Sequence, residues 1–173
     1  MQLLICPGFH SPDLTNAFLQ SFLGVLTPER VWVLPIDATP RAMVWLFNAE
    51  QRPRQEHLLQ IVAFSAGVVA VYPLVLAWQK MGGTSRLIAI DGWGMPLLGV
   101  SNIYRVSHDR WTHNTTHFPT PAEGAGYFYA EPAVDHLSLW QSPHLTQGLG
   151  SLAASAPRSM MALEFICAVL SQE

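Results

Sequence analysis

The chain of 173 residues is long enough to bury one substantial hydrophobic core and short for two, so we expect a single domain over residues 1–173. Half of its residues are hydrophobic and only 12% are charged, against about 25% in average soluble proteins. The formal net charge of −3, with no basic stripe, removes the usual electrostatic basis for binding nucleic acid, and we expect no such partner.

The amino-terminal part of the chain predicts two strands and two helices. Leu3–Cys6 is a short apolar run that stops at a Pro-Gly pair, which is typical of a strand buried on both faces. A helix should follow, with Ser11 as its N-cap and proline in its first turn. Val31–Leu34 predicts the second strand, and residues 41–51 carry apolar side chains at helical spacing.

The middle of the chain, Leu58–Trp78, contains no charged residue. A helix of that length could cross a bilayer of about 30 Å. However, Ser65 and Pro73 interrupt the run, and no cluster of Lys or Arg flanks it to set an orientation. The pattern therefore favours a buried strand, Leu58–Phe64, followed by a buried helix, Ala66–Met81, and we expect no membrane span.

The remainder of the chain predicts three more strands and a final helix. Strands alternating with helices predict right-handed crossovers and a mainly parallel sheet covered on both faces. We therefore expect an α/β fold, a three-layer sandwich around a six-stranded sheet. The expected segments are the strands Arg86–Asp91, Ile103–Val106 and Tyr127–Ala130, a connecting loop over Thr146–Pro157 and a helix over Ser159–Leu170.

Ser65 stands where the central strand is expected to turn into the central helix. Its neighbours two positions away, Ala63 and Gly67, are small, as a tight turn between closely packed elements requires. This stretch resembles the nucleophile elbow of the alpha/beta-hydrolase superfamily, G-x-S-x-G, with Ala63 in place of the first glycine. The alternative from the residues alone is that Ser65 only caps the helix.

The resemblance implies a catalytic triad in the order nucleophile, acid, histidine. Asp109 follows the fifth predicted strand and His136 follows the sixth, so both share with Ser65 the sheet edge where open parallel sheets place their sites. Ser65 would attack, His136 would transfer the proton, and Asp109 would orient His136. Asp91, after the fourth strand, is the alternative acid.

The resemblance also implies an oxyanion hole formed by backbone N–H groups. The donors would be Ala66, after the nucleophile, and Phe9, in the loop after the first strand. His10, Trp93 and Trp111 follow strand ends and are candidates for contacting substrate, although tryptophan is more often a core residue.

Histidines near the fifth strand allow another interpretation, a metal site. His113 and His117 have ligand spacing if they lie on a helix, with His108 and Asp109 nearby. Prolines and threonines in the stretch predict a loop instead, so we expect no metal and no cofactor.

The two cysteines, Cys6 and Cys167, are far apart in the sequence and predict buried free thiols rather than a disulfide framework. The amino terminus does not resemble a secretory signal, which favours a cytoplasmic protein.

Together, these features predict a small, lidless serine esterase or acyl hydrolase that forms an acyl-enzyme on Ser65. The apolar loops suggest a small-molecule substrate with an uncharged or acyl-chain part. The alternative is a hydrolase-fold protein that binds a ligand or partner without catalysis. The sequence does not indicate an oligomeric state.

Overall fold

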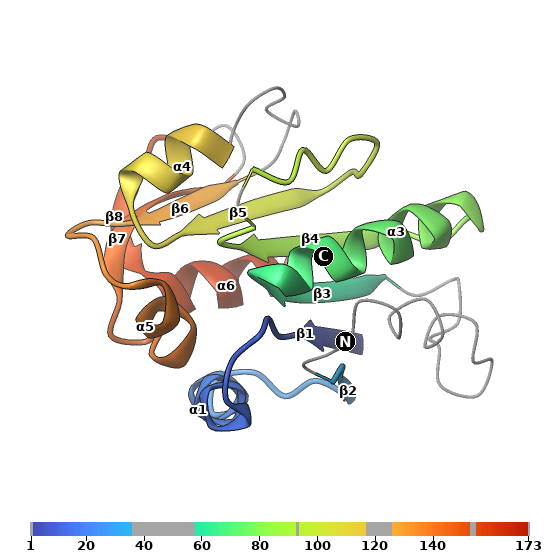
Figure 1. The fold of residues 1–173 in the computed structure, drawn as a ribbon, viewed down its shortest axis with the longest axis horizontal. Coiled ribbons are helices and arrows are strands. Elements are labelled where there is room, and N and C mark those ends of the chain that lie inside the picture. The colour runs from blue at the N-terminus through green and yellow to red at the C-terminus, as the bar shows by residue number, and fades with distance from the viewer. Residues whose placement is uncertain (1, 36–57, 93, 117–125, 153–154, 173) are drawn as a thin grey trace.

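The computed structural model describes residues 2–35, 58–92, 94–116, 126–152 and 155–172. These residues form an α/β fold around one mixed, mostly parallel sheet of eight strands (Figure 1). The strands are β1 Gln2–Cys6, β2 Arg30–Val33, β3 Leu59–Phe64, β4 Ser85–Ile90, β5 Ile103–Ser107, β6 Tyr127–Ala130, β7 Gln147–Ser151 and β8 Arg158–Met161.

The strands lie side by side in the order β2-β1-β3-β4-β5-β6-β7-β8. Neighbouring strands from β2 to β6 are parallel, whereas β7 and β8 pair antiparallel. Because parallel strands end at the same edge of a sheet, the segments that follow β3, β4, β5 and β6 meet there. Ser65, Asp91, His108 and His136 all belong to these segments.

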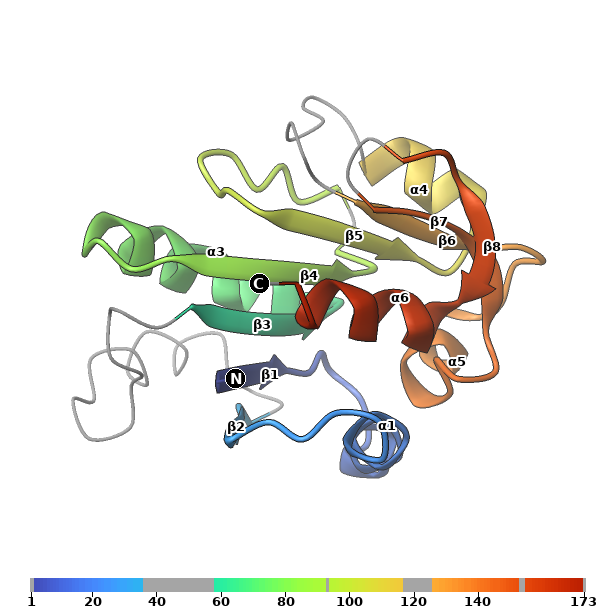
Figure 2. The ribbon, with the colours of Figure 1, turned by 180° about the vertical axis from the view of Figure 1, so that it is seen from behind.

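Helices cover both faces of the sheet (Figures 1 and 2). On one face α3 packs against β1, β3 and β4, and α4 packs against β5 and β6. On the other face α1 contacts α5 and α6, and α6 lies on β6, β7 and β8. The helices of the described residues are α1 Pro12–Leu23, α3 Ala66–Lys80, α4 Arg110–Thr116, α5 His136–Gln141 and α6 Ala162–Leu170.

The central strand β3 has every residue buried because it is covered on both faces. Its side chains alternate: Ile61 and Ala63 belong to the core under α3, whereas Val62 and Phe64 belong to the core under α1, α5 and α6. Two helical layers on one sheet therefore account for the uncharged central run.

That run forms strand β3 followed by helix α3, as predicted. In the parts of the chain that the structure describes, every helix falls short of the length and hydrophobicity needed to cross a lipid bilayer.

All six predicted strands are confirmed, but the sheet has two more. The prediction of a connecting loop over residues 146–157 is wrong for Gln147–Ser151, which forms β7, and β8 begins directly after that segment, at Arg158. Glycine in β7 permits close packing: a Cβ atom on Gly148 would lie 2.1 Å from the carbonyl oxygen of Tyr129, and one on Gly150 would lie 2.6 Å from Sδ of Met160. The small residues that suggest a loop are there because the neighbouring strand and β8 come so close.

Among the helices, α1 and α3 are confirmed and the last one begins later than predicted. It starts at Ala162 because Arg158–Met161 is taken up by β8. The expectation that the stretch around His113 is a loop is wrong as far as Thr116: Arg110–Thr116 form α4, and the Thr112 N–H donates to the carboxylate of Asp109 at 2.6 Å. The helix predicted over residues 41–51 lies outside the described residues.

Candidate active site

Ser65 occupies a sharp turn between β3 and α3. Its backbone has φ 53° and ψ −122°, a region that residues with a side chain seldom adopt. The turn is held from the strand side, where Ser65 N–H donates to the Ile90 carbonyl at 2.9 Å. The Ser65 hydroxyl makes no capping hydrogen bond to α3, so the interpretation of Ser65 as only a helix cap is wrong.

Small residues around Ser65 allow three backbone segments to touch. A Cβ atom on Gly67 would lie 2.2 Å from the carbonyl oxygen of Cys6, and one on Gly8 would lie 2.9 Å from Cβ of Ser65. The loop after β1 therefore lies directly against the turn. Larger side chains at Gly8 or Gly67 would push that loop away from Ser65.

The two residues predicted to supply oxyanion donors flank this contact. Ala66 is the first residue of α3, and N–H groups in the first turn of a helix have no partner within the helix. Phe9 follows Gly8 in the loop that touches Ser65, and its side chain is 68% exposed. Both donors thus belong to backbone segments in contact with the serine.

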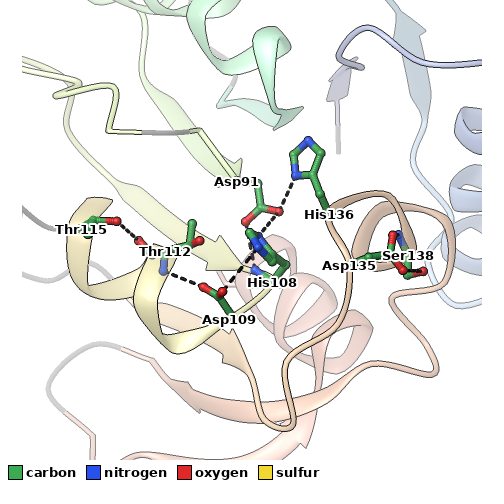
Figure 3. Close-up of polar contacts among 8 residues, drawn as sticks. All are labelled: Asp91, His108, Asp109, Thr112, Thr115, Asp135, His136 and Ser138. Carbon is green, nitrogen blue, oxygen red and sulfur yellow. Dashed lines mark hydrogen bonds and ion pairs between the residues drawn. The ribbon is translucent and has the colours of Figure 1, made fainter.

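Asp91 begins the segment after β4 and is held rigidly. Its φ is 48°, its N–H donates to the Val106 carbonyl at 2.8 Å, and its side chain is fully buried. One carboxylate oxygen, Oδ2, bonds Nδ1 of His136 at 2.8 Å and Nδ1 of His108 at 2.9 Å (Figure 3). The other, Oδ1, accepts the His108 backbone N–H at 3.0 Å.

The carboxylate of Asp109 has other partners, Thr112 and His108. Oδ1 accepts the Thr112 N–H, and Oδ2 lies 3.5 Å from Nε2 of His108. Burial raises the pKa of the Asp109 carboxyl, but the hydrogen bonds from Thr112, the charge of His108 and the Trp111 N–H together hold this pKa below its ordinary value. The hydrogen bond to His136 belongs to Asp91, so the geometry favours the alternative acid over Asp109.

His136 is the first residue of α5 and lies on an aromatic stack. Its ring stacks on Phe64 with centroids 4.5 Å apart. The stack continues from Phe64 to Trp140 at 5.0 Å and from Trp140 to Phe18 at 3.9 Å. Because Phe64 immediately precedes Ser65, the stack holds the imidazole beside the turn. Nδ1 of His136 faces Asp91 and Nε2 points away from it (Figure 3).

The candidate substrate-binding residues divide into three cases. The His10 ring lies 5.7 Å from that of Phe64, and its Nε2 is buried without a hydrogen-bond partner among the described residues. Trp111 is 73% exposed and lines a cavity of about 600 Å³ together with His108 and other residues. Trp93 lies outside the described residues. The other residues lining the cavity are Gly94, Asp109, Thr112, Thr115 and Thr116.

His108 is the part of the site that sequence reasoning missed. It follows β5, and the sequence pattern suggests for it either a metal cluster with His113 and His117 or a place at the site entrance, not a bond to the acid. His113 instead packs its ring on Tyr127 and Tyr129, with centroids 4.6 and 4.8 Å away, and His117 lies outside the described residues. The signal for His108 was its place at a strand end, immediately before Asp109.

Both cysteines are free thiols, as predicted; Cys6 is buried as expected, whereas Cys167 is only half-buried. Burial raises the pKa of Cys6 to about 12 and that of Cys167 to about 11. Neither thiol is therefore suited to act as a nucleophile near neutral pH.

No family model matches the chain, and a search of curated proteins also finds no match. The structure shows an α/β protein with one mostly parallel, eight-stranded sheet. Function is therefore inferred from the geometry of the site.

Proposed function

We propose that the protein is a serine hydrolase of alpha/beta-hydrolase type that cleaves an ester or related acyl bond. Ser65 is the nucleophile, His136 the general base and Asp91 the acid that orients it. One observation carries the proposal: a serine in a strained strand-to-helix turn directly follows the phenylalanine on which His136 stacks, and Nδ1 of that imidazole bonds a fully buried carboxylate.

The chemistry follows from the hydrogen bonds of the site. An ionised carboxylate only accepts hydrogen bonds, so the bond to Asp91 keeps the His136 proton on Nδ1 and leaves Nε2 as the base. Nε2 removes the Ser65 hydroxyl proton as the oxygen attacks the acyl carbon, and the Phe9 and Ala66 N–H groups stabilise the oxyanion. Nε2 then protonates the leaving alcohol, and water hydrolyses the acyl-enzyme by the same steps.

The surroundings favour a substrate with an apolar part. Phe9 and Trp111 expose most of their aromatic surface, at 68% and 73%. Trp111 lines the cavity beside His108, and an open cavity with an aromatic wall suits an acyl chain or an uncharged leaving group. His10, with its buried unpartnered Nε2 near Phe64, can supply one polar contact to that substrate.

Labelling with a fluorophosphonate probe tests the proposal. The probe reacts with an activated serine, so wild-type protein should be labelled at one site and Ser65→Ala not at all. Ser171→Ala, an exposed serine that ends α6, is the matched control and should be labelled like wild type. A wild-type protein that stays unlabelled beside a reactive control hydrolase would refute the proposal. A panel of p-nitrophenyl esters of increasing chain length then defines the acyl part.

The second candidate is a hydrolase-fold protein that binds a ligand without catalysis. Two features favour it: Ala63 replaces the first glycine of the elbow pattern, and His108 shares the carboxylate oxygen that orients His136. It predicts an unlabelled Ser65 and no turnover of any ester in the panel.

A further inference from the structure

Three potential ligand atoms for a metal ion converge in the candidate site. One potential ligand atom from each of Asp91, His108 and His136 lies within 4.8 Å of the other two, and Oδ2 of Asp91 contacts Nδ1 of both histidines. A serine hydrolase needs only one of these imidazoles on its acid. The second imidazole on the same oxygen is therefore unexplained by the proposed reaction.

His108 lies between two carboxylates. Its Nδ1 is 2.9 Å from Oδ2 of Asp91, and its Nε2 is 3.5 Å from Oδ2 of Asp109. A neutral imidazole carries a single N–H and can donate to only one of these oxygens. A cation bound at Nδ1 removes the conflict, because the proton then resides on Nε2 and faces Asp109.

We infer that Asp91, His108 and His136 bind one divalent transition-metal ion of the zinc class. Two imidazole nitrogens and one carboxylate oxygen form a common zinc ligand set, with a fourth position for water. Metal–ligand bonds of about 2.0–2.2 Å separate tetrahedral ligands by roughly 3.4 Å. The two N–O distances of 2.8 and 2.9 Å then need to open by only about 0.5 Å.

The residues around the three ligands are those a metal site requires. Histidine ligands usually donate their second N–H to a carboxylate, and Asp109 stands in that place for His108. The ligating carboxylate is itself fixed, because Oδ1 of Asp91 accepts the His108 backbone N–H. The imidazoles are 21% and 25% exposed, so an ion can reach them from solvent.

Metal binding would inhibit the proposed hydrolase. This inhibition rests on the proposed function, whereas the metal site itself is argued from the geometry alone. When the ion takes Nδ1 of His136, the imidazole keeps its one proton by moving it to Nε2. Nε2 then cannot accept the proton of the Ser65 hydroxyl.

Calorimetric titration with Zn²⁺, and visible absorption with Co²⁺ in its place, test the site directly. Wild type and Ser65→Ala should each bind one equivalent of metal ion. The visible spectrum of the Co²⁺-bound protein should be that of a low coordination number. His108→Leu should weaken binding by about 100-fold or more. Asp109→Asn, which keeps the shape of the side chain, should weaken it by about 10-fold. His144→Ala, an exposed histidine elsewhere, should leave it unchanged.

The two proposals fail in distinguishable ways. Absence of stoichiometric binding in Ser65→Ala, or equal affinity in wild type and His108→Leu, would overturn the metal site whatever the labelling shows. If binding is present, Zn²⁺ should slow fluorophosphonate labelling of wild type with a midpoint equal to the calorimetric Kd. Labelling that is insensitive to bound Zn²⁺ would overturn the inhibition. A protein that is never labelled refutes the hydrolase, and the Co²⁺ spectrum still decides the metal site.

Discussion

Buried polar side chains at the amino ends of the central strands differ in their hydrogen bonding from those at the carboxyl ends. At the amino ends of β3 and β4, Gln60 and Arg86 are partners in register, and both are buried. Gln60 donates to the Leu170 carbonyl at 3.0 Å, and Arg86 donates to the carbonyls of Val169 at 3.1 Å and Gln172 at 2.8 Å. These side chains hold the end of α6, where backbone carbonyls need donors and favour positive charge.

At the carboxyl ends of the same strands, the polar residues have strained backbone angles and compete for shared hydrogen-bond partners. Ser65 and Asp91 both have positive φ. Asp91 receives two imidazoles on one oxygen, and His108 faces two carboxylates. The comparison teaches that burial of polar groups does not itself indicate function. Donors matched to acceptors hold the fold together, whereas strain and competition for one partner mark the site.

The largest effect is expected at the carboxyl end, from Asp91→Asn. An amide at this position can present its N–H₂ to His136 and reverse the imidazole tautomer, so kcat for a p-nitrophenyl ester should fall by about 10⁴. Asp109→Asn should lower kcat by less than about 10-fold, because Asp109 bonds Thr112. The reverse ranking of the two variants would return the role of acid to Asp109.

At the amino end, Arg86→Met should act on stability alone. It deprives two carbonyls at the end of α6 of their donor, which should reduce the free energy of unfolding by about 2 kcal/mol in urea titrations. Arg158→Met is the control, because its ion pair with Glu164 is exposed and should contribute less than about 1 kcal/mol. Equal effects of the two variants would contradict the role given to Arg86.

The strain at Ser65 can be measured by comparing two variants that lack the serine hydroxyl. Glycine tolerates φ 53°, so Ser65→Gly should be more stable than Ser65→Ala by about 1 kcal/mol. At Ser171, with φ −89° and ψ −3°, the order should reverse, because glycine only adds freedom to the unfolded chain. Thermal unfolding of all four variants checks both statements, and a less stable Ser65→Gly would argue against strain.

The smallest effect concerns the cap of α5, the helix that carries His136. The Ser138 hydroxyl and then the Ser138 N–H bond the Asp135 carboxylate and hold its pKa below the ordinary value. Because the folded pKa is the lower one, the stabilisation is present above the unfolded pKa and is lost as the pH falls through the folded pKa. In an NMR titration, Ser138→Ala should raise the Asp135 midpoint; an unchanged midpoint would exclude the hydroxyl as the main cause.

The sequence by itself determined the architecture of the parallel core. Short apolar runs alternating with helical patterns predict all six strands from β1 to β6. Central strands such as β3 and β4 are mostly apolar because they are covered on both faces, whereas the edge strand β2 is partly exposed. Small residues beside Ser65 predict the sharp turn, because only they let the loop after β1 approach the serine.

Only the tertiary structure decided the antiparallel pair β7 and β8 and which of Asp91 and Asp109 forms a hydrogen bond with His136. A glycine-rich segment is compatible with a loop or a close-packed strand until its neighbours are known. Strand order places both acids at one edge of the sheet. Which carboxylate bonds His136 depends on the backbone angles of Asp91 and on α4, whose Thr112 N–H bonds Asp109. These are contacts between segments far apart in the chain, and local pattern does not encode their distances.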